Sequence, residues 1–491
     1  MSDYEREARR GRLDALRTAG VDPYPAQVSK CDRISSVRER FDAVDADALE
    51  QSPESVAIAG RVMARRKFGK LMFLQLREDG SSIQVSVKKQ EVEEEVFQFA
   101  KELDVGDFIR VEGALWRTKT DELTVDLRQL TLLAKSLAPL PEKWHGLSDV
   151  ETRFRQRHLD LLVNEEARKI AVARSRIVKE MRAFLDRRDF IEVETPVLQP
   201  LYGGAAARPF ETHHNVYDQD LYLRISDELY LKRLVVGGLD RVYEIAHNFR
   251  NEGVSRKHNP EFTMMECYQA YADYRDMMDL TEEMVRSIAE AVLGTTKVVY
   301  QGDEIDLAGP WPRISMQKAL LDRTGVDILA APGVEELRQA IREAGRDPGE
   351  GASWGVVVDD LFSECVEPEL QAPTFITDYP LELSPLAKRS VEDPRVVERF
   401  EIFIAGMELG NAFSELNDPV DQRERFEDQR RAHEAGDEEA HPLDEDYLRA
   451  LEQGLPPTGG LGIGVDRLVM ILTNAPNLRE TVLFPHVRPE A

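Results

Sequence analysis

Short runs of alternating apolar and polar residues dominate the chain from Val56 to about residue 134. Alternation with a period of two is typical of half-buried strands, because successive side chains point to opposite faces. Turn signals such as Glu78-Asp79-Gly80 separate five such runs, and EVEEEVFQFAKEL interrupts them with a helical pattern. The pattern predicts a five-stranded β-barrel of the OB type, with an SH3-like barrel or another small sheet as the alternative.

The rest of the chain follows a different pattern. From Ile170 to Leu185, apolar residues recur at the spacing of one helix face, and this helix leads into the expected strand DFIEVETPVLQP. Strands are expected to dominate residues 221–268 and 400–416, and about 285–395 has a mixed helical character. Long βαβ repeats are absent, so we expect a mostly antiparallel sheet flanked by helices and an α+β fold class.

A length of 491 residues favours two or three domains over a single core. We expect four segments in order: a helical extension (1–54), the barrel as a nucleic-acid-binding domain (55–142), a linker (143–162) and a larger domain with an insertion at about 285–395 (163–491).

Composition and charge narrow the class of protein. The net charge of −27 argues against nucleic-acid binding over the whole surface, because phosphates need lysine and arginine. The cysteines, Cys31, Cys267 and Cys365, form no C-x-x-C pair, which indicates reduced thiols. No window approaches the roughly 18 apolar residues of a membrane span, and the charged N-terminus has no signal-peptide pattern. A cytoplasmic protein is expected.

One stretch of the barrel is basic in this acidic chain. Residues 55–76 contain no acid and five cations: Arg61, Arg65, Arg66, Lys67 and Lys70. Phe73 follows this run on a strand, and Gln84 lies on the next strand. Cations for phosphates and a ring for unstacked bases are what single-stranded nucleic acid requires. The alternative is a solvated strand face with Phe73 in the core.

A long hairpin is predicted where RVYEIAHNFRN and PEFTMMECY flank the polar loop EGVSRKHN. Alternation places four side chains of its second strand on one face: Phe262, Met264, Glu266 and Tyr268. An acid on a mostly apolar strand is costly without a partner. Glu266 therefore indicates a ligand for a cation, or else a glutamate that faces solvent at the rim of the sheet.

Two further carboxylates occur in RFEIFIAGMELGNAFSELND, where Gly406 allows a turn that would bring Glu408 back opposite Glu401. Facing carboxylates repel each other and need a cation between them, which is ordinarily magnesium when phosphates are present. A surface acid pair or the carboxylate pair of a sugar-cleaving enzyme is the alternative. Three residues then recur with a period of two: Asn411, Phe413 and Glu415.

The stretch LPPTGGLGIGVDRLVMIL is rich in glycines, which let a ligand lie against the backbone. Its spacing is not that of a dinucleotide fingerprint. A helix is expected to begin near Asp466, and Arg467 is placed to meet a phosphate or a purine face. Close packing of neighbouring strands is the alternative reason for the glycines.

Together these stretches resemble the class II aminoacyl-tRNA synthetases of the aspartate, asparagine and lysine subgroup, and most closely the bacterial lysyl type. FIEVETPVLQP is similar to motif 1 of that family, NFRNEGVSRKHNPEFTMMECY to motif 2 and GLGIGVDR to motif 3. Three positions depart from the family pattern: Leu201-Tyr202 precedes GGAAARPF, Lys257 replaces an arginine before the motif 2 histidine, and RISDELYLKR stands in place of RIAPELYLKR.

The resemblance implies roles for individual residues. Those for ATP are Arg250, Glu252, His258, Phe262 and Arg467, of which Arg250 and Arg467 are the catalytic residues. Those for lysine are Gly204, Glu228, Glu266, Tyr268, Asn411, Phe413 and Glu415. Those for Mg²⁺ are Glu401 and Glu408, and those for the anticodon are Arg66, Phe73, Gln84 and Glu122.

The activity that the resemblance implies is ATP-dependent activation of L-lysine to lysyl-adenylate and transfer to the 3′ end of tRNA(Lys). It also implies a homodimer through the motif 1 region around Pro196, without membrane attachment. An aspartate- or asparagine-specific synthetase is one alternative. Another is a non-catalytic RNA-binding paralogue, which the carboxylate pair and Arg467 disfavour, or a lysyltransferase acting on a protein, which the barrel disfavours.

Overall fold

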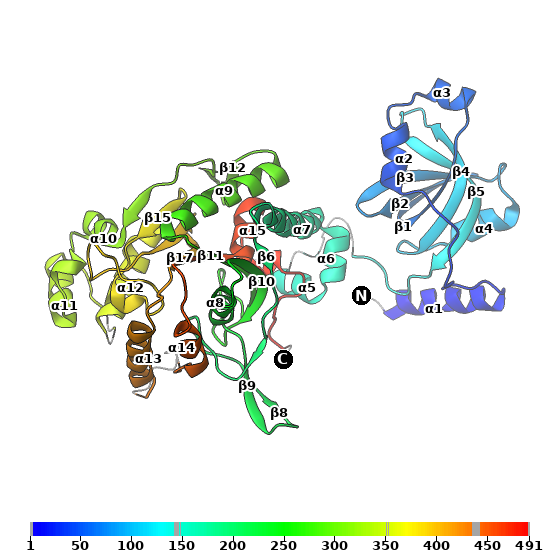
Figure 1. Ribbon diagram of the computed structural model, residues 1–491. Helices are drawn as coiled ribbons and strands as arrows, with labels where there is room; N and C mark the ends of the chain where they lie inside the picture. The colour runs from blue at the N-terminus through cyan, green and yellow to red at the C-terminus, as the bar shows by residue number, and fades with distance from the viewer. Residues whose placement is uncertain are drawn as a thin grey trace. The chain divides into compact units, whose positions relative to one another are not determined.

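The computed structural model divides the chain into two compact units, residues 1–146 and 147–491 (Figure 1). The residues that it describes are 3–141, 147, 149–349, 351, 353–434 and 442–489. Each unit is considered by itself. The expected linker, 143–162, begins outside the described residues, because 142–146 and 148 are not among them. Its later part forms two helices that belong to the second unit.

The first unit is a closed five-stranded barrel with strand order β1-β2-β3-β5-β4, which confirms the OB-type prediction. Its strands are β1 (Ser55–Phe68), β2 (Leu71–Glu78), β3 (Ser81–Lys88), β4 (Phe108–Arg117) and β5 (Leu123–Ala134). Its helices are α1 (Asp3–Thr18), α2 (Ile34–Phe41), α3 (Ala46–Gln51) and α4 (Glu94–Glu102). Barrel closure comes from parallel pairing of β3 with β5.

The alternating pattern of the barrel strands places every second side chain of β2 in the barrel core. Met72, Leu74 and Leu76 of β2 are fully buried, and the residues between them face outward. Phe73 therefore lies outside the barrel core, where its ring meets that of the exposed Phe68 at a centroid distance of 6.3 Å. This arrangement excludes the alternative in which Phe73 is a core residue.

The second unit is built on an eight-stranded sheet of order β14-β15-β16-β17-β18-β11-β10-β6. The strands are β6 (Ile191–Glu192), β10 (Arg241–Phe249), β11 (Glu261–Ala270), β14 (Arg313–Ser315), β15 (Thr374–Thr377), β16 (Arg399–Ile404), β17 (Met407–Ser414) and β18 (Thr458–Gly464). All neighbours pair antiparallel except at the two edges, where β14 runs parallel to β15 and β6 to β10. The expected antiparallel sheet is thus confirmed.

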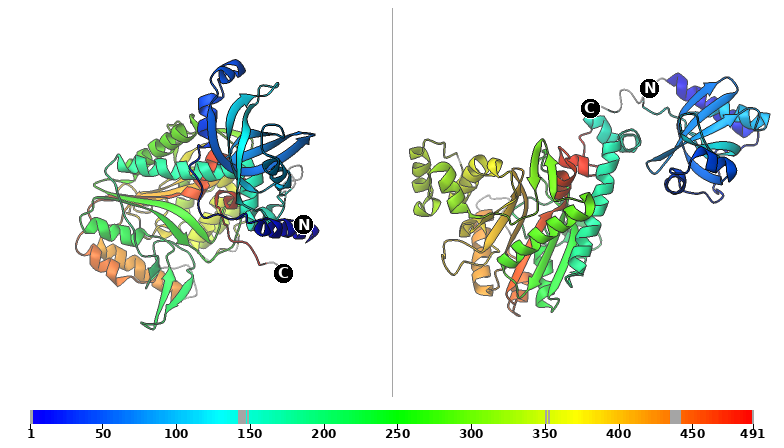
Figure 2. Two further views of the ribbon diagram at one scale, coloured as in Figure 1. Left: turned by 90° about the vertical axis from the view of Figure 1, so that its right-hand side faces the viewer. Right: turned by 90° about the horizontal axis from the view of Figure 1, so that it is seen from above.

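Helices and small sheets surround this main sheet (Figures 1 and 2). The helices are α5 (Val150–Arg155), α6 (Arg157–Val163), α7 (Glu165–Asp186), α8 (Glu228–Val236), α9 (Tyr274–Leu293), α10 (Met316–Thr324), α11 (Val334–Glu343), α12 (Trp354–Cys365), α13 (Pro419–Glu434), α14 (Glu445–Leu451), α15 (Val465–Thr473) and α16 (Leu478–Thr481). The small sheets are β7 (Leu198–Gln199) with β9 (Gln219–Leu223) and β8 (Glu211–His214), and β12 (Lys297–Tyr300) with β13 (Asp303–Asp306).

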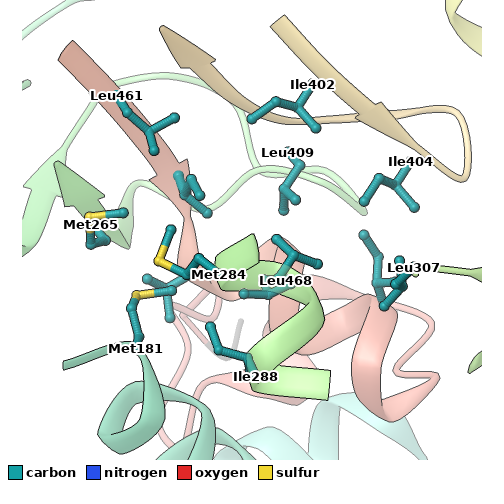
Figure 3. Close-up of a cluster of buried hydrophobic side chains, with 14 of the residues drawn as sticks. Met181, Met265, Met284, Ile288, Leu307, Ile402, Ile404, Leu409, Leu461 and Leu468 are labelled. Atoms are coloured by element: carbon teal, nitrogen blue, oxygen red, sulfur yellow. The ribbon is translucent and has the colours of Figure 1, made fainter. Parts of the chain in front are cut away.

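One face of the main sheet packs on α7, α9 and α15 to form the largest core (Figure 3). Met181, Met284 and Leu468 come from these three helices, and Met265 and Leu461 come from the central strands. Successive strand residues point to opposite faces, so the neighbours of these core residues point to the other side of the sheet. That other side carries the candidate site.

Two expectations about strands are wrong in part. Residues 228–236, expected within a strand-dominated stretch, form helix α8, whose Leu229, Leu231 and Val235 pack with Phe426 of α13. The expected strand DFIEVETPVLQP yields only the two-residue strands β6 and β7. Within the described part of the chain, none of the helices has both the length and the apolar character that spanning a membrane would need.

Candidate active site

A cavity of about 300 Å³ opens on the face of the main sheet opposite the helical core. The strand alternation creates it: Met265 and Ile402 lie in the core, whereas the adjacent residues Glu266 and Glu401 line the cavity. All fourteen residues that the sequence assigns to ATP, lysine and magnesium line this one cavity. The structure thus brings them together, and their individual roles stay predictions.

One end of the cavity presents cations around an aromatic ring. The guanidinium carbon of Arg250 lies 5.1 Å from the centroid of the Phe262 ring. The Nε atom of Arg250 is buried and makes no hydrogen bond with the described residues. Burial lowers the pKa of this guanidinium, which stays far above neutral pH. A buried cation with an unused donor suits an anionic ligand, and a half-buried ring that lines the cavity suits a planar base.

Arg467 and His258 close the same end of the cavity. Nη1 of Arg467 donates to the backbone oxygen of Glu408 at 2.5 Å and to its Oε2 at 3.1 Å. Nη2 of Arg467 lies 3.2 Å from Nε2 of His258, and Nδ1 of that ring lies 2.8 Å from Oγ of Ser255. Burial and the charge of Arg467 lower the pKa of His258. At neutral pH the imidazole is therefore uncharged and polar.

The two other cations of the β10–β11 loop anchor the loop itself. Nε of Arg256 donates to the carbonyl of Pro476 at 2.7 Å. Nζ of Lys257 donates to Oε1 of Glu367 at 2.7 Å and to the carbonyl of Gly406 at 2.9 Å. Lys257, the departure from the family pattern, thus ties the loop to the turn between β16 and β17.

The carboxylates Glu401 and Glu408 lie on neighbouring strands. The sequence predicted that they are directly opposite each other, and this part of the prediction is wrong. The turn pairs Ile404 with Met407 and therefore places Glu408 opposite Phe403. A bulge after Ile402 shifts the register by one residue, and Glu401 pairs with Asn411. Both carboxylates nevertheless line the cavity.

Their electrostatic environments differ. Glu401 accepts from Arg399 Nη2 at 2.6 Å and from the Tyr379 hydroxyl at 2.8 Å. Burial raises the pKa of Glu401 to about 7 despite Arg399. Burial also acts on Glu408, but the charge of Arg467 and its hydrogen bond outweigh it, and the pKa of Glu408 is lowered.

These two carboxylates fit a magnesium ion that shares the phosphates of a substrate. Magnesium is commonly held by one or two carboxylates plus phosphate oxygens and waters. No group of three or more metal-ligating side chains occurs among the residues that the structure describes, so a cage made of protein ligands alone is not present there.

The other end of the cavity is strongly acidic. Glu228, Glu266 and Glu415 line it, and the fully buried Lys232 forms ion pairs with Glu228 and Glu415. Glu266 accepts from Ser226 Oγ at 3.0 Å and from the Tyr268 hydroxyl at 3.1 Å. Burial raises the pKa of all three glutamates. Three acids face one built-in cation, which leaves the pocket suited to a second cation.

Glycines make room for this acidic pocket. A Cβ atom on Gly460 would lie 1.9 Å from Glu415 Oε1 and 2.6 Å from the Tyr268 ring. Gly204 has a φ of +87°, and a Cβ there would lie 2.8 Å from Ser226 Oγ. The glycines therefore serve the pocket rather than only the strand packing.

Four residues of the site escaped the sequence analysis: Arg399, which lines the cavity, and three buried residues around its carboxylates, Asp227, Lys232 and Tyr379. A signal existed for Lys232, because it follows Glu228 by four residues in ELYLKRL and would pair with it on a helix. Arg399 precedes Glu401 by two residues on one strand, which places both on one face.

In the first unit, the four residues assigned to the anticodon form one connected group on the outer face of the barrel. Arg66 pairs in register with Phe73, and its Nη2 donates to Gln84 Oε1 at 3.1 Å. Nε2 of Gln84 donates to Thr124 Oγ1 at 3.0 Å, and that hydroxyl donates to the carbonyl of Glu122 at 3.0 Å. A cation, a half-buried ring and an amide group are thus assembled in one place.

The fold and site define a class II synthetase catalytic domain combined with a nucleic-acid-binding barrel. The family described as tRNA synthetases class II (D, K and N) matches residues 149–488, and the OB-fold nucleic acid binding domain matches residues 56–133. The chain belongs to the class II tRNA synthetases of the D, K and N subgroup, which use ATP and tRNA.

Curated relatives narrow the similarity further. The chain is 55% identical to the lysine–tRNA ligase of Chloroflexus aurantiacus, over 98% of this chain and 97% of the relative. It is 52% identical to that of Pelotomaculum thermopropionicum (98% and 94%) and 49% identical to that of Staphylococcus aureus strain MRSA252 (98% and 97%).

Proposed function

We propose that this protein is a lysine–tRNA ligase. It activates L-lysine with ATP to form lysyl-adenylate and pyrophosphate, and then transfers the lysyl group to the 3′ end of tRNA(Lys). The lysine carboxylate attacks the α-phosphate, the bond from that phosphorus to the bridging oxygen of pyrophosphate breaks, and the terminal ribose hydroxyl of tRNA later displaces AMP.

The observation that carries the proposal is the charge contrast along one cavity. The end with Arg250 and Arg467 suits the phosphates of ATP, with Phe262 against the adenine, and the end with Glu266 and Glu415 suits an ammonium group. An aspartate side chain would place a further carboxylate against buried acids, which is electrostatically unfavourable. Gly204, Tyr268, Asn411 and Phe413 would complete the lysine pocket.

The residues act by positioning and by charge stabilisation, so no side-chain nucleophile is required. Arg250 and Arg467 stabilise the negative charge that develops on the α-phosphate, and a contact of this type typically contributes roughly 10²-fold in rate. Glu252 and His258 orient the adenine edge and the outer phosphates. Glu401 and Glu408 would hold Mg²⁺, which supplies neutralisation of phosphate charge when bound.

The barrel would read the anticodon through Arg66, Phe73, Gln84 and Glu122, with the base stacked on Phe73. We assign it residues 55–142 and the catalytic domain residues 163–491. Dependence on tRNA and reduced cysteines favours the cytoplasm.

A homodimer through the surface around Pro196 belongs to the same proposal. Four apolar side chains in that region are exposed in the single chain: Ile191, Val197, Leu198 and Leu201. Such a patch favours burial against a partner. Sedimentation equilibrium should give twice the chain mass, and a monomer at micromolar concentration would refute this part.

The function is tested by amino-acid-dependent exchange of pyrophosphate into ATP. Lysine should support exchange by the wild type, and Glu266→Ala should lose it, whereas Glu261→Ala, an exposed acid on the same strand, should retain it. Exchange with aspartate or asparagine alone would identify a different synthetase. A wild type without exchange would indicate a non-catalytic paralogue.

A further inference from the structure

The middle of the cavity floor carries Asn411, between the cationic and the acidic end. Along β17 it follows Glu408 by three residues and precedes Glu415 by four, which is roughly 10 and 14 Å at the usual rise of a strand. Across the sheet it pairs with Gly462, which in turn pairs with Glu266 and carries no side chain between them. A lysine whose ammonium lies at the acidic end and whose carboxylate reaches the α-phosphate therefore brings that carboxylate close to Asn411.

A neighbouring arginine fixes which end of the Asn411 amide faces the cavity. Nε of Arg399 donates to Oδ1 of Asn411 at 2.9 Å. A guanidinium has donors and no acceptor, so the amide atom beside it must be the oxygen. Among the described residues, the amino group Nδ2 of Asn411 has no hydrogen-bond partner, and Asn411 lines the cavity. The amide thus offers the cavity a donor, which suits a carboxylate and does not suit an ammonium group.

The guanidinium of Arg399 is itself fixed from several sides. Nη1 donates to the carbonyl of Leu383 at 2.6 Å and to Oγ of Ser384 at 2.9 Å. Nη2 donates to Oε1 of Glu401 at 2.6 Å, and the guanidinium carbon lies 4.5 Å from the centroid of the Tyr379 ring. All three nitrogens are therefore engaged with protein groups. A planar fork held at each nitrogen has one orientation, so its hold on Asn411 does not depend on the substrate.

We propose that Arg399 is a positioning residue that keeps the amino group of Asn411 turned toward the carboxylate of the bound lysine. If the amide turned over, its oxygen would face that carboxylate, and two acceptors repel each other. Arg399 acts through Asn411, because its own nitrogens are already engaged, and so helps to align the carboxylate for attack on the α-phosphate. This inference rests on the proposed function, because it requires a ligand with an ammonium group and a carboxylate.

Replacement of Asn411 by aspartate tests the orientation of the amide. Asn411→Asp keeps the shape of the side chain and its contact with Arg399, but it puts an oxygen where the amino group stood. Titration calorimetry should show a loss in affinity for L-lysine of roughly 10- to 150-fold, as for a hydrogen bond to a charged group. L-Lysinamide, whose amide nitrogen can donate to the aspartate, should retain its affinity. Binding of L-lysine by Asn411→Asp at least as tight as by the wild type would overturn the inference.

A second set of variants tests whether Arg399 acts through Asn411. Arg399→Met removes every donor of the guanidinium, and the affinity for L-lysine should fall roughly tenfold. In the background of Asn411→Ala the same change should have almost no effect, because alanine has no amide to orient. A role of Arg399 in general stability, or through Glu401 alone, would give the same loss in both backgrounds, and that result would contradict the inference.

Arg425→Met is the matched control for the loss of a buried arginine. Nη1 of Arg425 also holds the segment that Arg399 contacts, by donating to the carbonyl of Ser384 at 3.1 Å and to that of Ala387 at 2.8 Å. Arg425 does not line the cavity. Its removal should leave the affinity for L-lysine nearly unchanged, and a loss equal to that of Arg399→Met would mean that only the segment matters.

Failure of this inference is distinguishable from failure of the proposed function. Lysine-dependent pyrophosphate exchange by the wild type, together with undiminished lysine affinity in Arg399→Met, would remove the role of Arg399 and leave the ligase activity intact. A wild type that binds no lysine would overturn both. If Arg399→Met does not fold, the titration of Asn411→Asp decides, because that variant retains Arg399 and its contacts.

Discussion

The ion pairs of Lys232 give a quantitative test of the pocket electrostatics. The substitution Lys232→Met keeps the approximate volume of the side chain and removes the cation that pairs with both Glu228 and Glu415. Removing one partner of a buried ion pair typically costs about 3–5 kcal/mol, because a buried charge is left without compensation. The unit that contains it has about 345 residues, for which the entropy of unfolding is about 0.7 kcal/mol/K. The expected loss in Tm is therefore about 4–7 °C.

The pH dependence of this loss identifies its cause. In the wild type the pKa of Lys232 is raised, so its ion pairs stabilise the folded protein at every pH below the ordinary pKa of a lysine side chain. In the variant, the pKa values of Glu228 and Glu415, already raised by burial, should rise further. A carboxyl group whose pKa is higher in the folded than in the unfolded protein lowers the free energy of unfolding at pH values above its pKa in the unfolded protein. This loss of stability becomes smaller as the pH falls.

The difference in the free energy of unfolding between wild type and Lys232→Met should therefore shrink from pH 8 to pH 5.5. The slope should be about 1.4 kcal/mol per pH unit for each proton taken up. Urea unfolding at the two pH values measures it, with Lys297→Met, which removes an exposed ion pair, as a control that should change little. An equal loss at both pH values would mean that packing, rather than charge, explains the effect.

Two further predictions concern the pocket and the barrel. Gly460→Ala places a Cβ against Glu415 and the Tyr268 ring, so lysine-dependent exchange should fall roughly 10²-fold, as for a misplacement of about 1 Å. Gly11→Ala, where a Cβ meets nothing within 4 Å, should leave exchange unchanged, and comparable losses in both variants would refute the steric argument. Phe73→Ala should reduce kcat/KM for tRNA charging roughly 5- to 150-fold without altering exchange, while Phe73→Trp retains most charging, because stacking contributes about 1–3 kcal/mol per base. A change in exchange by Phe73→Ala would contradict a role in anticodon reading alone.

Much of the candidate site could be predicted because it lies on strands. Alternation along β11 assigned Phe262, Glu266 and Tyr268 to one face, and all three line the cavity. The helix beginning near Asp466 was also correctly expected, since α15 starts at Val465. Local periodicity was sufficient here, because each of these placements depends only on the geometry of one element.

Other placements depended on segments far apart in the chain. Helix α8 was missed, since its Leu- and Val-rich sequence fits a strand equally well, and packing against α13 and α14 decides for the helix. The bulge after Ile402 moved Glu408 by one position relative to Glu401, and no pattern in the sequence announces such an extra residue.

The sequence by itself determined the barrel, the antiparallel sheet and the family, because these follow from periodicity and from distinctive local stretches. Only the tertiary structure decided how the buried charges pair. Lys232 lies in the middle of α8 and Glu415 just beyond β17, and their ion pair arises from how these elements pack. Electrostatic energy depends on distances of a few ångströms in a low-dielectric interior, and such distances are set by packing rather than by sequence order.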